Sequence, residues 1–279
     1  MPLLRRDFLA LGALPLAAAA PPLKFGHRHA AMMREPDLSV FEMAGRIRGL
    51  QGVELQVRWK SYNLWDKATL LATKREAFRW GIQIPSLAGI WGPGASLITN
   101  PEESLRRSIA AAELLGASVV LVAAFRERCP NVTEESSYGP VVRSLQKVAP
   151  AAADAGVVLG LETSLSPVDH RKLAEMVNHP AVQVYYDLHN MEFYEHREQA
   201  VPGVAAIGRQ QICQVHLKNE KKLLAEAGSV DWTAAVRALR AIQYDGWYVF
   251  ETAHTGTEQC VEATEKNIEF VRRVHTSSH

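Results

Sequence analysis

Residues 156–190, GVVLGLETSLSPVDHRKLAEMVNHPAVQVYYDLHN, contain the two strands and the helix that decide the fold. The segments GVVLGLET (156–163) and VQVYYDL (182–188) are continuously apolar, as expected of strands buried on both faces of a parallel sheet. Ser166-Pro167 between them is typical of a helix start, because serine caps a helix and proline suits its first position. The stretch therefore predicts a strand–helix–strand unit.

The same pattern continues along the rest of the chain, where helical segments separate further apolar runs. One such helix is expected to begin at Asn100-Pro101 and to end at Gly116, and another to begin at Asp231. The further apolar runs span residues 23–29, 52–59, 81–87, 117–125, 211–218 and 247–252. With the two strands above, they make eight predicted strands.

Eight strands, each followed by a helix with a right-handed crossover, close most simply into a (β/α)8 TIM barrel of the α/β class. A doubly wound open sheet is the alternative, but no glycine-rich phosphate-binding motif follows the first predicted strand. No linker or change in composition marks a second domain, so residues 21–279 are expected to form one barrel domain.

Four consecutive predicted strands end in potential metal ligands. These residues are Glu162, Asp187, His216 and Glu251. Because the carboxyl ends of barrel strands meet at one face, we expect the four side chains to converge there. Crowded carboxylates repel one another unless a cation compensates them, and three oxygen donors with one imidazole suit Mn²⁺, Mg²⁺ or Co²⁺, with Zn²⁺ as an alternative.

The chain resembles the xylose isomerase-like superfamily of sugar isomerases and epimerases, which includes the tagatose and psicose 3-epimerases. The resemblance rests on the segments GVELQV, LGASVVLV, AGVVLGLET, VQVYYDLHN, VHLKN, GSVDWTAAVRAL and YDGWYVFET. It implies that the same four residues hold the metal, and that Glu162 and Glu251 also act as an acid–base pair. Such a pair would remove and return a proton next to a carbonyl, through an enediolate that the metal stabilises.

The chain departs from the sugar epimerases at positions that contact the substrate. Where the resemblance implies a glutamate six residues after Glu162, the chain has Val168; where it implies a histidine three residues after Asp187, the chain has Asn190. Two alternatives to an isomerase or epimerase of free ketoses therefore stay open. One is an exported lyase or hydrolase acting on 3-keto-glycosides, and the other is a non-catalytic sugar-binding barrel.

Three residues beside the predicted ligands are candidates for contacting a carbohydrate substrate. Asn190 follows the strand that ends in Asp187, and Lys218 shares a strand face with His216 two residues earlier. His29 is the last residue of the first predicted strand.

Composition excludes several other classes. The chain has 31 basic and 30 acidic residues, a formal charge of +1, so no basic surface suggests a nucleic-acid partner. Three scattered cysteines are too few for a disulfide framework or a thiolate zinc site and are expected to be free thiols. The pattern leaves the oligomeric state open, a homo-oligomer included.

Residues 1–20, MPLLRRDFLALGALPLAAAA, have the layout of a cleaved export signal. Arg5-Arg6 followed by Asp7-Phe8-Leu9 resembles the twin-arginine signal, which a receptor reads and which is no stable membrane anchor. The apolar run of this segment is short for a membrane span and contains Pro15. We therefore expect a periplasmic or secreted protein.

Overall fold

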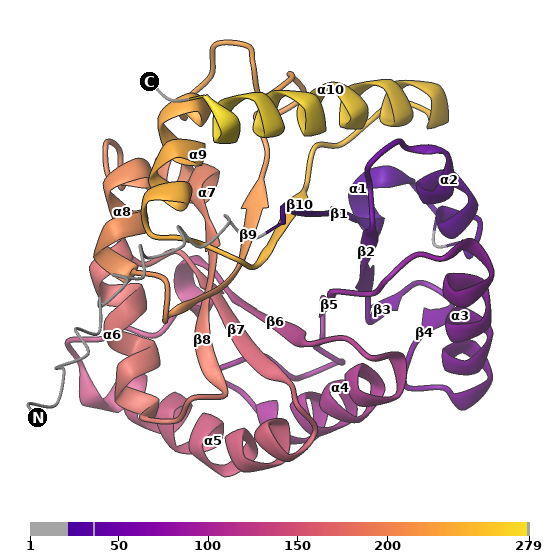
Figure 1. Cartoon of the computed structure of the whole chain (residues 1–279). Coiled ribbons are helices and arrows are strands. Elements are labelled where there is room, and N and C mark those ends of the chain that lie inside the picture. Colours follow the sequence, from indigo (N-terminus) through magenta and orange to yellow (C-terminus); the bar gives the residue numbers. More distant parts are fainter. Residues whose placement is uncertain (1–21, 36, 278–279) are drawn as a thin grey trace, which may run out of the picture.

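The computed structural model describes residues 22–35 and 37–277, and eight of its strands form a closed parallel barrel (Figure 1). Their order around the barrel is β1-β10-β9-β8-β7-β6-β5-β2, with β1 paired to both β2 and β10. The predicted (β/α)8 TIM barrel is thus confirmed. The barrel strands are β1 (Lys24–Arg28), β2 (Gly52–Gln56), β5 (Ser86–Ala88), β6 (Val119–Ala124), β7 (Val158–Thr163), β8 (Val182–Asp187), β9 (Ile212–Leu217) and β10 (Trp247–Phe250).

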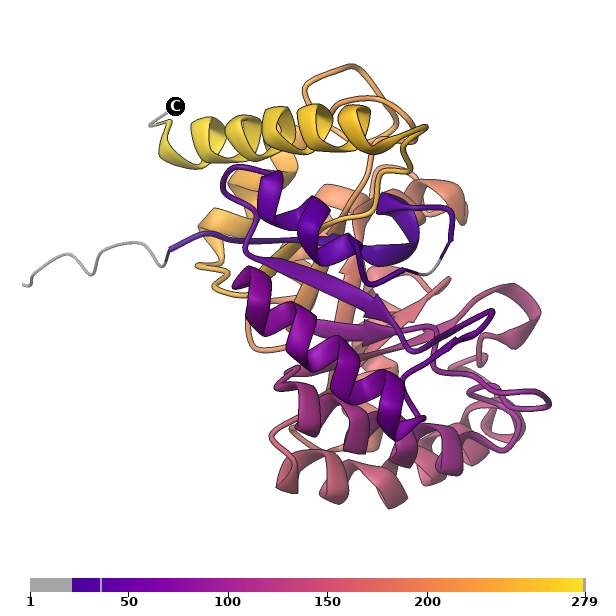
Figure 2. The same ribbon diagram turned by 90° about the vertical axis from the view of Figure 1, so that its right-hand side faces the viewer.

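Helices surround the strands on the outside, and Figure 2 shows α3 crossing in front of them. A short antiparallel hairpin of β3 (Arg58–Trp59) and β4 (Tyr62–Asn63) follows β2. The helices are α1 (His29–Met32), α2 (Val40–Arg46), α3 (Lys67–Trp80), α4 (Pro101–Leu115), α5 (Glu135–Asp154), α6 (Pro167–Val177), α7 (Leu188–Phe193), α8 (Ala200–Ile207), α9 (Trp232–Ala241) and α10 (Thr257–Thr276).

Side-chain caps fix the starts of several helices where the sequence predicts them. The hydroxyl of Ser166 accepts a hydrogen bond from the backbone N–H of Asp169 at the start of α6, and the carboxylate of Asp231 caps α9 in the same way. Asn100 differs from expectation, because it adopts a left-handed conformation with φ of 45° and its side chain makes no cap. Helix α4 still begins at the predicted Pro101.

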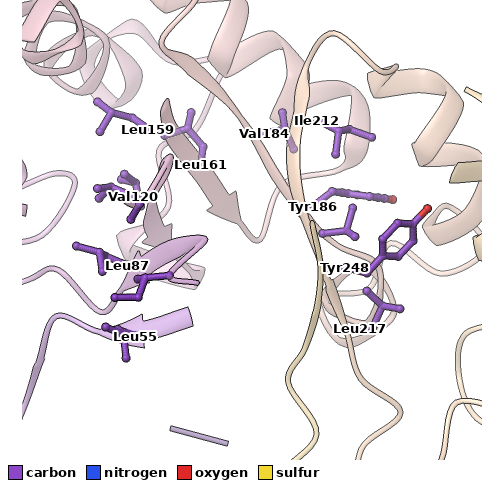
Figure 3. Close-up of a cluster of buried hydrophobic side chains, with 14 of the residues drawn as sticks. Leu55, Leu87, Val120, Leu159, Leu161, Val184, Tyr186, Ile212, Leu217 and Tyr248 are labelled. Atoms are coloured by element: carbon purple, nitrogen blue, oxygen red, sulfur yellow. The ribbon is translucent and has the colours of Figure 1, made fainter. Parts of the chain in front are cut away.

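The main hydrophobic core lies between the outer face of the barrel and the helices. Along β7, Leu159 and Leu161 point toward this layer, as do Val215 and Leu217 on β9, and Figure 3 shows several residues of the cluster. The alternate positions on each strand face the barrel interior. This alternation places Glu162 and His216 inside the barrel.

The third barrel strand in the chain, β5, is shorter than predicted. Residues 81–87 were expected to form it, but β5 begins only at Ser86, with Gln83 making an isolated bridge to Gly52. Pro85 has no backbone N–H to give to a strand ladder, which explains why the regular strand starts after it. Similarly, the expected strand 52–59 is divided into β2 and the first strand of the hairpin.

The expected signal peptide, residues 1–20, lies outside the described residues. Among the residues that are described, no helix has the length and apolar character needed to cross a membrane.

Candidate metal centre

The four predicted ligands lie together at the carboxyl ends of neighbouring strands. Glu162 is near the end of β7, Asp187 ends β8, His216 lies in β9, and Glu251 directly follows β10. Strand register sets their level: Asp187 is paired with His216, and the backbone N–H of Glu251 donates to the carbonyl of Leu217 at 2.9 Å. One ligand atom from each of the four lies within 4.8 Å of the others.

His216 stands at the centre of this group, with Nδ1 facing all three carboxylates. This atom is 3.3 Å from Oε1 of Glu162, 3.6 Å from Oε2 of Glu251 and 3.9 Å from Oδ2 of Asp187. The imidazole is completely buried, as is the side chain of Asp187. The side that faces the carboxylates is therefore the side that would face a shared ion.

The opposite nitrogen of His216 is held by Glu54, a completely buried residue of β2. His216 Nε2 lies 3.0 Å from Oε1 of Glu54. The hydroxyls of Ser86 and Tyr185 each donate to Oε2 of Glu54 at 2.7 Å, and the amide of Gln214 donates to both hydroxyls. Such a partner orients a ligating histidine and fixes which nitrogen is free to bind.

These charges shift the pKa of His216. Burial alone would lower the pKa, but the fields of Glu251 and Glu54 and a hydrogen bond with Glu162 outweigh it and raise the pKa to about 10. Burial likewise works against the ionised form of Glu54, and His216 and Arg28 more than compensate, so that the pKa of Glu54 is lowered.

Two cations share the carboxylates with His216. The guanidinium of Arg28, at the end of β1, pairs with Oε1 of Glu251 and lies 3.8 Å from Oε1 of Glu54. Nζ of Lys218 lies 2.7 Å from both Oε2 of Glu251 and Oδ2 of Asp187. Both oxygens of Glu251 therefore have a cationic neighbour.

The residues of this centre fit a divalent metal. Three carboxylates and one imidazole nitrogen form a donor set suited to Mn²⁺, Mg²⁺ or Co²⁺, and also to Zn²⁺. Oδ2 of Asp187 is buried and has no hydrogen-bond partner among the described residues, although the charge of Lys218 is near. Glu54 and the three ligand carboxylates make four negative charges, and Arg28 and Lys218 supply two positive charges. With His216 neutral, a divalent ion would bring the formal charge of this group to zero.

A pocket of about 370 Å³ opens beside the centre. Glu162, Glu251, Arg28 and Lys218 line it, together with Asn190, whose amide donates to Oε1 of Glu162 at 3.0 Å. Its outer wall is aromatic: the ring of Phe125 stacks on that of Tyr194 at 5.4 Å, and Phe193 packs edge-on against Tyr194.

Two of the three predicted substrate contacts line the pocket, and the third does not. Asn190 and Lys218 line the pocket, whereas His29 is not among its lining residues. His29 is buried, with its ring edge-on to Trp59 and Tyr62 at the β3–β4 hairpin. Val168, where the resemblance led us to expect a glutamate, lies on α6 with 63% of its surface exposed.

Sequence reasoning missed Glu54 and Arg28. The signal available for Glu54 was a single charge inside the apolar run GVELQV, and for Arg28 a basic residue at the end of a predicted strand. Neither position belongs to a local motif, and the contacts that connect them to the four ligands, Arg28 with Glu251 and Glu54 with His216, span more than 160 residues of sequence.

A family model described as the xylose isomerase-like TIM barrel matches residues 43–274. The chain belongs to this family. No curated protein sequence matches the chain significantly.

Several solved structures have the same fold as this chain, although their sequences share little identity with it. D-allulose 3-epimerase from Methylomonas sp., in complex with D-allulose, has a TM-score of 0.72 at 17% identity, over 91% of this chain and 98% of that one. 3-Keto-D-glucoside 4-epimerase from E. coli has a TM-score of 0.71 at 19% identity, over 90% and 100%. D-psicose 3-epimerase from Clostridium cellulolyticum H10, with D-tagatose, has a TM-score of 0.76 at 15% identity, over 91% and 100%.

Proposed function

We propose that this protein is a metal-dependent isomerase or epimerase of a carbohydrate that carries a carbonyl group, with Glu162 and Glu251 as its acid–base pair. The observation that carries the proposal is the convergence of both glutamates with Asp187 and His216 around one point beside a substrate-sized pocket. Sugar epimerases among the solved structures of the same fold are consistent with it.

The chemistry divides between the metal and the two glutamates. A divalent ion held by the four ligands would stabilise the negative charge that develops on the substrate oxygens. One glutamate then takes a proton from the carbon next to the carbonyl, and the other returns a proton. Return to the opposite face of the same carbon inverts that centre, whereas return to the neighbouring carbon moves the carbonyl. Positioned acid–base groups of this kind typically raise the reaction rate by about 10²–10⁴-fold.

The surrounding side chains have separate tasks in this proposal. The amide of Asn190 holds one oxygen of Glu162 and so directs the other oxygen toward the substrate. Lys218 can donate a hydrogen bond to a substrate oxygen, because it lines the pocket and is one-fifth exposed. Arg28 keeps Glu251 ionised, as the deprotonated partner of the pair.

A second candidate is a lyase or hydrolase that acts on 3-keto-glycosides, and the aromatic outer wall favours it. Phe125, Phe193 and Tyr194 offer ring faces to a group attached to the sugar. The sugar-reading glutamate expected at Val168 is also lacking. In this reaction the same proton is removed next to the carbonyl. The electron pair then expels the oxygen of the attached group from the adjacent carbon, and an acid protonates that oxygen.

Solvent deuterium exchange tests both candidates. The purified protein is incubated with Mn²⁺ in D₂O, with free ketoses in one series and 3-keto-glycosides in another, and deuterium at carbon is followed by NMR. We expect exchange with one substrate class, and its loss in Glu162→Gln and Glu251→Gln. Glu113→Gln, an exposed position on α4, is the matched control.

The outcomes separate the candidates. Exchange with ketoses supports the epimerase, and loss of the glycosidic group supports the lyase or hydrolase. Folded protein that binds metal yet shows no exchange and no glycoside loss with either class contradicts both and leaves a sugar-binding barrel.

We also propose that the protein acts after export, on the support of residues 1–20 alone. Replacing Arg5 and Arg6 with lysine is expected to retain the protein inside the cell, as measured by cell fractionation. Unchanged export of this variant would contradict a twin-arginine route.

A further inference from the structure

A second group of metal-ligand side chains lies outside the barrel interior, behind the end of β1. His27 belongs to β1, His254 to the loop between β10 and α10, and Cys260 to the first turn of α10. One ligand atom from each of these residues lies within 4.8 Å of the others. His27 and Cys260 are completely buried, and His254 is partly buried.

The orientation of His27 is already that of a ligand. Its Nδ1 lies 3.2 Å from the backbone carbonyl of Arg28, so this nitrogen carries the proton and donates it. Nε2 is then unprotonated and points toward His254, with 3.3 Å between the two Nε2 atoms. A backbone carbonyl on the far nitrogen is a common way for a protein to fix the tautomer of a metal-binding histidine.

The separation of the two imidazoles also matches a shared ion. Zinc binds histidine nitrogens at about 2.0–2.1 Å in a tetrahedral arrangement, which places two ligating nitrogens about 3.3–3.4 Å apart. The observed 3.3 Å falls in this range. We propose that His27, His254 and Cys260 form a second metal site, suited to a softer ion such as Zn²⁺ and distinct from the carboxylate-rich centre.

An ion can reach this site from the surface. His254 lines a pocket of about 220 Å³, together with Thr252, Gln259 and Glu262. Three protein ligands leave one tetrahedral position free, and the pocket can supply water to it. On binding, the Cys260 thiol loses its proton to solvent and a sulfur–metal bond forms, with no change of oxidation state.

The site would act on the catalytic centre through its position. His27 directly precedes Arg28, and His254 lies three residues after Glu251, so two of its ligands adjoin residues that line the catalytic pocket. An ion bound there would join β1 and the loop after β10 to α10. The three ligands do not line the catalytic pocket, so the role of the bound ion would be to position the residues that do.

Cobalt is the probe that distinguishes the two sites, because a thiolate bound to Co²⁺ produces an intense near-ultraviolet band that carboxylate and imidazole ligands do not. The experiment uses the full chain with Glu162→Gln and Asp187→Asn, which weaken the first centre. We expect Co²⁺ to give the thiolate band in this background. Cys260→Ser should abolish the band, and Cys129→Ser, which lies outside the cluster, should keep it.

A second variant guards against a misfolded Cys260→Ser protein. His254→Gln changes a partly buried loop residue, and we expect it to stay folded by circular dichroism and to weaken Co²⁺ binding by roughly tenfold or more. The proposal is overturned if no thiolate band forms, if the band survives Cys260→Ser, or if folded His254→Gln binds Co²⁺ like its parent. Since activity is not measured, these outcomes are independent of the proposed reaction.

Discussion

Glu54 and His216 form a buried contact of 3.0 Å between two strands that are not neighbours in the barrel. Its effect is to turn Nδ1 of His216 toward the three ligand carboxylates. The contact thus connects Glu54, which lies outside the four candidate ligands and the pocket lining, to the geometry of the candidate metal centre.

Glu54→Gln is expected to weaken metal binding about 10–100-fold, the usual effect of losing the partner of a ligating histidine. Either orientation of the new amide creates a conflict. Its NH₂ group faces the N–H of His216, or it faces the hydroxyls of Ser86 and Tyr185, which already accept hydrogen bonds from Gln214. Competition with a chromophoric chelator measures the affinity.

Tyr185→Phe is the control for this variant, because it removes one hydrogen bond to Glu54 and leaves the contact with His216 intact. We expect it to change affinity less than Glu54→Gln. Equal affinities for wild type and a folded Glu54→Gln protein would contradict the orienting role.

Metal binding should release about one proton at pH 7. In the metal-free protein the pKa of His216 is raised to about 10, so its imidazole is protonated and must lose a proton before Nδ1 can bind. Affinity is therefore expected to rise with pH, by up to about tenfold per unit below pH 10. Calorimetry in buffers of different ionisation enthalpy counts the protons.

The raised pKa of His216 also affects the stability of the metal-free protein, which falls with rising pH whereas the metal affinity rises. A pKa that is higher in the folded state stabilises the fold fully below the unfolded pKa of about 6.5, and this contribution is lost as the pH rises through about 10. The His216→Gln variant lacks this titration.

Metal binding without proton release at pH 7 would argue that His216 is not a ligand.

Arg28→Met is expected to shift the pH dependence of catalysis. Burial raises the pKa of Glu251, but Arg28, His216 and Lys218 lower it by more, so Glu251 is ionised in the folded protein. Without the guanidinium, the acid limb of the pH–rate profile for isotope exchange should move to higher pH, and the maximal rate should fall about 10²-fold.

Arg58→Met, the same substitution on the β3–β4 hairpin, is the control because Arg58 does not line the catalytic pocket. It should leave the profile in place. An Arg28→Met profile that overlays the wild-type profile would show that Arg28 does not govern Glu251.

Gly160→Ala should destabilise the barrel by about 1–3 kcal/mol. A Cβ at this position of β7 would lie 2.8 Å from Sγ of Cys213 and 3.2 Å from Cβ of Tyr185. The free energy of unfolding from urea titration measures the effect. Gly256→Ala is the control, because a Cβ there meets no atom within 4 Å. Equal stability of the two variants would contradict tight packing inside the barrel.

The sequence was sufficient to predict the barrel and the convergence of the four candidate ligands, for a physical reason. Parallel strands buried on both faces are recognisable as apolar runs, and polar residues that end successive runs must meet at one face. Glu162 and Asp187 are such residues. Long-range partners could not be predicted in this way, because Glu54 reaches His216 only after the barrel has closed.

The second cluster shows the same limit. His27, His254 and Cys260 have no metal-motif spacing in the sequence, and the scattered cysteines pointed instead to free thiols. Only the pairing of β1 with β10 brings the two histidines together. The shortened β5 has a local cause, since Pro85 interrupts an apolar run that otherwise predicts a strand.

The pairing of the first barrel strand with the last has a consequence for biosynthesis. Glu251 follows β10, and β10 closes the barrel by pairing with β9 and with β1, which lies more than two hundred residues earlier in the chain (Figure 1). A nascent polypeptide that ends before β10 lacks Glu251. A metal centre built from the four candidate ligands could therefore form only after β10 has been synthesised.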